Sequence, residues 1–243
     1  MKSFMKITTV MFDLDGTLLP MDLEKFVKTY FGLLAKKMAA FGYEPEKLLQ
    51  AVGGGVKAMT TNTSGKTNEE IFWDYFTSIY GENVRKDIPL FEEFYKNEFK
   101  QAVAVCGFTP KSKEVIDLVK ELGLRCICAT NPVFPAIATE TRMRFAGIEP
   151  EEFDYYTTYE NSCFCKPNPV YYQEILQKIG CKPEECLMVG NDVTEDMAAE
   201  TLGMKVFLLT DCLINKENKD IAQYPHGSFE ELKEYIRECA AEA

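Results

Sequence analysis

Short apolar runs alternate with helical periodicities along most of the chain. The run from Ile7 to Phe12 predicts a buried strand, and further strands are predicted at 124–129, 153–158, 186–189 and 205–209. Helical spacing of apolar residues predicts helices at 110–122, 135–145, 169–179, 194–202 and 228–240. Because strands that alternate with helices favour a parallel sheet covered on both faces, we expect an α/β fold. Its doubly wound, mainly parallel sheet should have five or more strands.

The segment from about residue 20 to residue 105 shows no clear strand pattern. Its apolar positions recur at helical spacing over 22–41, 44–59, 68–80 and 90–105. Asp22 and Asn68 are predicted N-caps. Gly53-Gly54-Gly55, within or near the end of the second helix, disfavours helix formation. We therefore predict an α/β core formed by residues 1–19 and 106–243, with an inserted helical domain formed by residues 20–105.

Composition limits the classes of partner. With 46% hydrophobic and 27% charged residues, the 243-residue chain is typical of soluble globular proteins. Its apolar runs are too short for a membrane span, and Met1 to Lys6 lacks the features of a signal peptide. The net charge of −11 argues against a nucleic-acid partner, because such a surface needs a basic face. We expect a monomer or a small homo-oligomer.

The nine cysteines indicate reduced thiols in a cytoplasmic protein, because the number is odd and no secretory signal is found. Two pairs, Cys126/Cys128 and Cys163/Cys165, have C-x-C spacing, whereas structural zinc sites usually have longer spacings. The single histidine, His226, excludes a site with several histidine ligands.

Polar residues follow four of the predicted strands. They are Asp13 and Asp15 after the first strand, Thr130 and Asn131 after the second, Lys166 after the third, and Asp192 and Asp196 after the fourth. Because the carboxyl ends of parallel strands share one edge of the sheet, we expect these residues to converge on one crevice. Carboxylates suit Mg²⁺, whereas a hydroxyl, a backbone N–H and a lysine suit an anion. An anion beside a divalent cation indicates phosphoryl chemistry.

The order of these motifs resembles the haloacid dehalogenase superfamily, subclass I, with a helical C1-type cap. The matching stretches are Asp13-Leu14-Asp15-Gly16-Thr17, Thr130-Asn131, Lys166-Pro167-Asn168-Pro169 and Gly190-Asn191-Asp192-Val193-Thr194-Glu195-Asp196. Together they span almost the whole chain. The helical insert between the first two motifs resembles the cap of that subclass, which implies a phosphatase-like enzyme.

The resemblance implies a role for each matching residue. Asp13 is the expected nucleophile, which forms an aspartyl-phosphate, and Asp15 the expected general acid and then base. Thr130 and the backbone amide of Asn131 are expected to bind phosphate oxygens. Lys166 is expected to neutralise charge at Asp13. Mg²⁺ is expected on Asp13, the Asp15 carbonyl and Asp192, with Asp196 supporting the metal site. Glu195 is interpreted as an ordinary first-turn acid.

We therefore predict Mg²⁺-dependent hydrolysis of a small phosphomonoester metabolite. Asp15 favours a phosphatase or phosphomutase, because cleavage of a carbon–halogen bond leaves no alkoxide to protonate. A phosphomutase of the β-phosphoglucomutase type and a non-catalytic, phosphate-binding or receiver-like switch are the alternatives. In the insert, the three glycines with Lys57 and the loop around Lys66 are candidates for reading the leaving group. Trp73 is interpreted as part of the insert's core.

Overall fold

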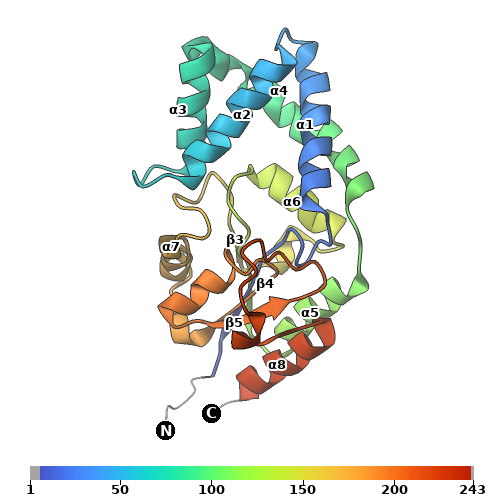
Figure 1. Cartoon of the computed structure of the whole chain (residues 1–243), viewed down its shortest axis with the longest axis vertical. Coiled ribbons are helices and arrows are strands. Elements are labelled where there is room, and N and C mark those ends of the chain that lie inside the picture. Colours follow the sequence, from blue (N-terminus) through green and yellow to red (C-terminus); the bar gives the residue numbers. More distant parts are fainter. Residues whose placement is uncertain (1–5, 242–243) are drawn as a thin grey trace.

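The computed structural model describes residues 6–241, so the expectation for Met1 to Met5 lies outside the described residues. A six-stranded sheet forms one half of the molecule (Figure 1), with the order β3-β2-β1-β4-β5-β6. Its strands are β1 (Thr9–Phe12), β2 (Arg125–Cys128), β3 (Tyr155–Tyr156), β4 (Cys186–Gly190), β5 (Lys205–Leu209) and β6 (His226–Gly227). All neighbouring strands pair in parallel. The predicted fold class is confirmed.

Helices cover both faces of the sheet, as its alternating side chains require. On one face, Val10 and Phe12 of β1 pack with α5 (Pro110–Glu121) and α8 (Phe229–Ala241). On the other face, Met11 packs with α7 (Pro169–Ile179) and with η5 (Met197–Leu202). Across 6–241, no helix is long and apolar enough to cross a membrane.

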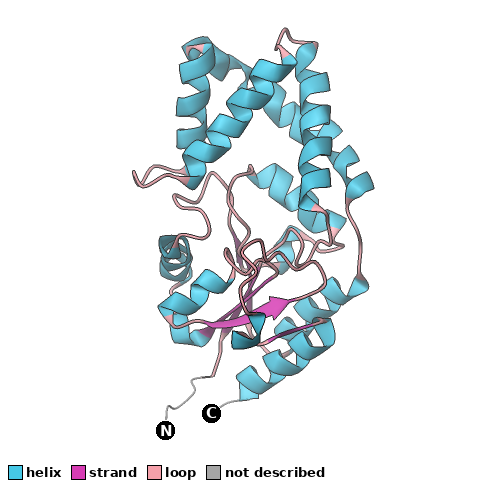
Figure 2. Cartoon of the chain, viewed as in Figure 1, coloured by secondary structure: helices cyan, strands magenta, loops and turns pink. Residues whose placement is uncertain are grey.

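The inserted segment is built of helices and loops alone, as Figure 2 shows. Its elements are α1 (Leu23–Ala39), α2 (Pro45–Thr60), α3 (Asn68–Tyr80), η1 (Glu82–Asp87), α4 (Ile88–Lys96) and η2 (Glu98–Val105). An aromatic cluster that includes Phe26, Phe76, Phe94 and Phe99 fills the space between them. Trp73 belongs to this cluster, as the sequence predicts. The helix α6 (Ala136–Phe145) contributes residues both to this cluster and to the core under the sheet.

The three consecutive glycines lie inside α2 and do not end it. A Cβ atom on Gly54 would lie 2.2 Å from the Tyr75 hydroxyl, and one on Gly55 would lie 2.6 Å from the Phe72 ring. The glycines therefore let α2 approach α3 closely. The cap of α3 is Thr67, which forms a capping box with Glu70 and so corrects the prediction of Asn68.

Two predicted helices differ from the structure. The segment 90–105 breaks at Asn97, whose side-chain amide donates to the Glu93 carbonyl at 3.0 Å and so competes with the helical hydrogen bonds. The segment 194–202 contains only η5, because the residues before Met197 form a loop that carries site residues. The short elements η3 (Pro150–Glu152), η4 (Pro183–Glu185) and η6 (Ile221–Gln223) complete the fold.

The two chain crossings between sheet and insert run side by side. Met21 and Cys106 form an antiparallel bridge, and the Gly107 N–H donates to the Pro20 carbonyl at 2.7 Å. A Cβ atom on Gly107 would lie 3.0 Å from Pro20, so a glycine suits this contact. The division into domains at residues 19/20 and 105/106 stays a prediction.

Candidate active site

The loop after β1 brings Asp13 and Asp15 to the carboxyl edge of the sheet. The loop closes tightly, because the Gly16 N–H donates to the Leu19 carbonyl at 2.8 Å and the Leu19 N–H donates to the Leu14 carbonyl at 2.8 Å. Gly16 has a φ of +89°, and a Cβ atom there would lie 2.4 Å from the Asn191 amide nitrogen. Glycine is therefore required where the chain turns beneath the site.

Two side chains fix the Asp13 carboxylate. The Lys166 ammonium donates to Oδ1 at 2.8 Å, and the Thr17 hydroxyl lies 3.2 Å from Oδ2. Thr17 also donates to Asn191 Oδ1 at 2.9 Å, so the fourth motif supports the first. Burial alone would lower the pKa of Lys166, but the carboxylates of Asp13 and Asp196 raise it well above its ordinary value. The lysine therefore stays charged beside Asp13.

Asp196 is held between the lysine and the backbone. Its Oδ1 accepts from Lys166 at 2.7 Å, and its Oδ2 accepts from the Asp192 N–H at 2.9 Å. Gly190 makes room for this carboxylate, because a Cβ atom there would lie 2.1 Å from it. Both Asp196 oxygens thus have partners within the protein. This geometry favours a supporting role at a metal site over direct ligation.

Asp192 is oriented by the loop that follows it. Its Oδ1 accepts from the backbone N–H groups of Thr194 at 2.7 Å and Glu195 at 2.9 Å. A neighbouring loop braces this one, since the Ile214 N–H donates to the Asn191 carbonyl at 2.8 Å. Asp192 consequently has little freedom to rotate.

Asp15 lies beside a buried arginine that sequence reasoning did not identify. The Arg142 Nε atom lies 3.4 Å from Asp15 Oδ1, and its guanidinium carbon lies 4.2 Å from the centre of the Phe134 ring. Burial raises the pKa of Asp15, while Arg142 opposes that shift. Within the described chain, Asp15 Oδ1 and Arg142 Nε have no hydrogen-bond partner. A raised pKa favours the protonated form of a carboxyl, which is the form that a general acid requires.

The Thr130-Asn131 loop is anchored from below and from the side. The Thr130 carbonyl accepts from the Thr157 hydroxyl at 2.6 Å and the Tyr171 hydroxyl at 2.8 Å. The side-chain amide of Asn131 donates to Glu195 Oε2 at 3.2 Å. Burial raises the pKa of Glu195, which lines the cleft and is thus more than the ordinary first-turn acid inferred from the sequence.

The structure brings the predicted residues together at one cleft of about 320 Å³. Six of the seven line it, namely Asp13, Asp15, Thr130, Asn131, Asp192 and Asp196. The seventh, Lys166, is buried behind Asp13. Lys57 and Lys66 are not among the residues that line the cleft, and Lys66 instead pairs with Asp74 at 2.8 Å. Lys216, which sequence reasoning missed, lines it from the loop after β5.

The donor set fits Mg²⁺ better than a metal that needs an all-protein cage. Within residues 6–241, no three Asp, Glu, His or Cys side chains form a group that could hold a metal ion. Asp13 and Asp192 nevertheless line the same cleft. Mg²⁺ commonly binds through one or two carboxylates and keeps water or substrate phosphate in its other positions. The two carboxylates with the Asp15 carbonyl satisfy that requirement.

A parallel sheet with this cleft defines an α/β enzyme of the phosphohydrolase type. Residues 7–203 match the family model described as haloacid dehalogenase-like hydrolase. The chain belongs to this family, and the predicted hydrolase class is confirmed.

Known proteins resemble this chain in sequence or in fold. The chain is 25% identical over 206 residues to the pyrophosphatase PpaX of Bacillus cereus (strain AH820), covering 83% of this chain and 82% of PpaX. Its fold is similar to that of a predicted phosphoglycolate phosphatase from Haemophilus somnus 129PT (TM-score 0.57, 16% identity, 95% and 98% coverage). It is also similar to magnesium-bound HAD-hydrolase YfnB from Bacillus subtilis (TM-score 0.57, 17% identity, 96% and 100% coverage).

Proposed function

We propose that the protein is a Mg²⁺-dependent phosphatase that hydrolyses a small phosphomonoester through an aspartyl-phosphate on Asp13. The observation that carries this proposal is the contrast between two neighbouring acids in one cleft. Asp13 accepts a hydrogen bond from the Lys166 ammonium at 2.8 Å, whereas burial raises the pKa of Asp15. The first environment suits a charged nucleophile and the second suits a proton donor.

In the first step, an Asp13 oxygen attacks phosphorus while the bond from phosphorus to the leaving oxygen breaks. Lys166 offsets the repulsion between the anionic carboxylate and the phosphate. Thr130 and the backbone amide of Asn131 hold the phosphate oxygens. When bound, Mg²⁺ would be held by Asp13, Asp192 and the Asp15 carbonyl, and would supply further positive charge at the transferring group. Asp15 gives its proton to the leaving oxygen, which departs as an alcohol.

In the second step, water hydrolyses the aspartyl-phosphate. Asp15, now a carboxylate, accepts a proton from the attacking water, and the bond between Asp13 and phosphorus breaks to release inorganic phosphate. Arg142 lies 3.4 Å from Asp15 and stabilises its carboxylate form between the two steps. Both acids thereby return to their starting protonation states.

We also propose that residues 20–105 act as a cap over the cleft. Tyr30 of α1 and Val56 of α2 line the cleft together with residues of the α/β part. The paired crossings at Met21 and Cys106 provide one place where a small backbone rotation could open and close it. Closure would exclude bulk water while the aspartyl-phosphate forms.

Phosphate release from a panel of phosphomonoesters and pyrophosphate, with Mg²⁺ or with EDTA, tests this function. We expect release with Mg²⁺ only, and a loss of at least about 1000-fold in Asp13→Asn, since covalent nucleophiles are indispensable. Asp211→Asn, at an exposed position, is the matched control. Normal turnover of Asp13→Asn would overturn the proposal. Normal turnover of Asp15→Asn alone would overturn the acid and base assignment.

Analysis of the organic products of the same reactions separates the alternative functions. A phosphomutase would return the phosphoryl group to a sugar, so an isomeric phosphate would form in place of inorganic phosphate. A non-catalytic switch would release no phosphate from any compound.

A further inference from the structure

The side of the cleft that faces the leaving group is apolar. Leu23, Val27, Tyr30 and Phe31 line it from one side of α1. Leu23 is 45% exposed and lines the cleft, so part of its apolar surface is open toward it. Apart from Asp13, Asp15, Asp192 and Asp196, the only charged residues lining the described cleft are Glu195 and Lys216.

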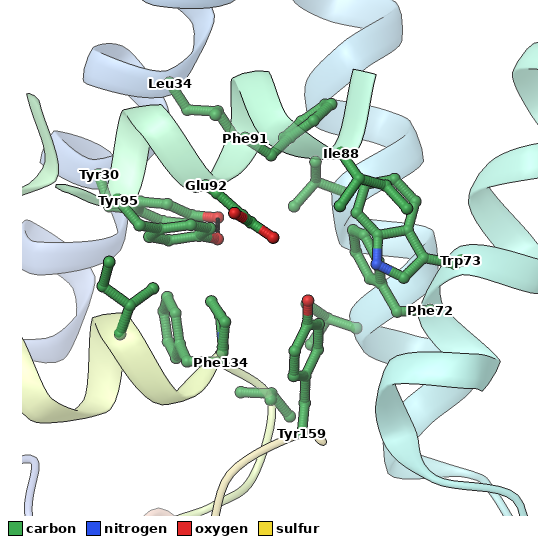
Figure 3. A pocket seen from close by; sticks show the side chains of 15 residues that line it. Tyr30, Leu34, Phe72, Trp73, Ile88, Phe91, Glu92, Tyr95, Phe134 and Tyr159 are labelled. Carbon is green, nitrogen blue, oxygen red and sulfur yellow. Dashed lines mark hydrogen bonds between the residues drawn. The ribbon is translucent and has the colours of Figure 1, made fainter. Parts of the chain in front are cut away.

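An aromatic chamber in the inserted segment adjoins this apolar side. Four residues line both spaces and therefore lie between them: Tyr30, Val56, Val133 and Phe134. In Figure 3, the aromatic rings of Tyr95, Phe91, Trp73 and Tyr159 surround an open space. The chamber has a volume of about 60 Å³, so it accommodates a short group only.

The polar groups of the chamber disfavour an anion. The hydroxyls of Tyr30 and Tyr95 lie 2.9 Å apart, so one of them donates to the other. Glu92, whose carboxylate points into the space in Figure 3, is the only charged residue that lines the described chamber, and its exposed side chain pairs with Lys96 at 3.4 Å. No cation lines the described chamber, so an anionic end of a substrate would lose its hydration there without gaining a counter-ion.

We propose that the substrate is the phosphomonoester of an apolar alcohol, whose short alkyl or aryl end enters this chamber. The inference rests on the proposed phosphatase function. The phosphate at Asp13 fixes one end of the molecule, so the leaving group must extend along α1 toward Tyr30. Each methylene buried there gains about 0.8 kcal/mol. Phosphoglycolate and pyrophosphate carry a second anionic group in place of an apolar end, so they lack this gain and are the poorer substrates.

A series of n-alkyl phosphates from ethyl to octyl, with phosphoglycolate and pyrophosphate beside them, tests the proposal. We expect kcat/KM to rise about fourfold per methylene until the chamber is full and then to level off, since 0.8 kcal/mol is about a fourfold change. Phosphoglycolate and pyrophosphate should fall below butyl phosphate.

Two pairs of variants locate the effect in the chamber. Val56→Phe fills the junction of the two spaces and should lower kcat/KM for hexyl phosphate relative to ethyl phosphate. Val103→Phe, at a 47% exposed position outside both linings, should leave that ratio unchanged. Glu92→Gln should raise kcat/KM for an alkyl phosphate that ends in a carboxylate relative to kcat/KM for the plain alkyl phosphate of the same length. Glu93→Gln, whose side chain pairs with Lys37 at 3.0 Å, should not.

The outcomes separate the two proposals. Release that needs Mg²⁺ and Asp13 but shows no dependence on chain length overturns the substrate class and leaves the phosphatase function standing. A preference for phosphoglycolate or pyrophosphate does the same. If no compound releases phosphate, the phosphatase function is overturned and the substrate class with it.

Discussion

Replacing Lys166 with methionine tests the electrostatic design of the site. The ammonium donates to Asp13 at 2.8 Å and to Asp196 at 2.7 Å, and the residue is only 2% exposed. Methionine is similar in length and lacks the charge. In Lys166→Met, two buried carboxylates therefore lose their counter-ion at once.

The expected loss is large because the pair is buried. Removing one partner of a buried ion pair typically costs about 3–5 kcal/mol of unfolding free energy. In the double variant Lys166→Met/Asp196→Asn, the charge left unpaired is halved, while the asparagine carbonyl can still accept from the Asp192 N–H. We expect the double variant to be more stable than Lys166→Met by about 1–3 kcal/mol, because groups in one network couple by this amount.

Urea unfolding in EDTA, followed by far-UV circular dichroism, measures these free energies. Fluorescence is less suitable, because the single tryptophan, Trp73, lies in the inserted segment and not at the site. Lys113→Met, in an exposed ion pair with Asp117, is the control and should cost about 1 kcal/mol or less. Additive effects of Lys166→Met and Asp196→Asn would refute the proposed coupling.

Three further predictions concern the helical insert, the thiols and the buried arginine. Gly55→Ala should lower the unfolding free energy by about 1–3 kcal/mol by displacing Phe72, whereas Gly53→Ala, with open space around it, should raise it by up to about 1 kcal/mol. Urea unfolding followed by Trp73 fluorescence checks this, and equal effects would contradict the close α2–α3 contact. Burial raises the pKa of the Cys181 thiol, but hydrogen bonds with Thr9, Cys186 and Thr8 bring it below its usual value. A disulfide reagent should therefore label Cys181 at lower pH than Cys163, whose pKa burial raises. Cys181→Ser should remove the labelling at low pH, whereas Cys163→Ser should retain it. Arg142→Met should lower kcat by up to about 100-fold with a smaller change in KM, because it loosens Asp15 and not the phosphate contacts; steady-state kinetics with an unchanged kcat would argue against this role.

The sequence predicts the central strands well because each is a short buried run between two helices. The strand β6 was missed for the opposite reason: its two residues, His226 and Gly227, are too few to show a period. The break at Asn97 was also missed, since it depends on a side chain that competes for a backbone carbonyl. The packing of Gly54 and Gly55 against α3 is a tertiary contact, which helix propensity cannot reveal.

At the site, motifs locate the acids and the lysine, but they do not locate what surrounds them. Arg142 lies within a predicted helix, where a lone arginine is usually exposed. Its burial arises only when Asp15, distant in the chain, and Phe134, from the loop before the helix, meet it. Glu195 was interpreted as an ordinary first-turn acid for a related reason, because its partner Asn131 comes from the loop after another strand.

These surroundings explain how two carboxyl groups, two residues apart, can take different roles. Asp13 accepts hydrogen bonds from a lysine and a threonine, and such bonds stabilise an ionised carboxylate. Asp15 has one oxygen without a hydrogen-bond partner in the described chain, and burial raises its pKa. Pairs of acids whose environments differ in this way divide nucleophile and proton donor between them. The apolar cleft reinforces the division, because a bound leaving group that excludes water from Asp15 favours its neutral form until Asp15 gives its proton to the leaving oxygen.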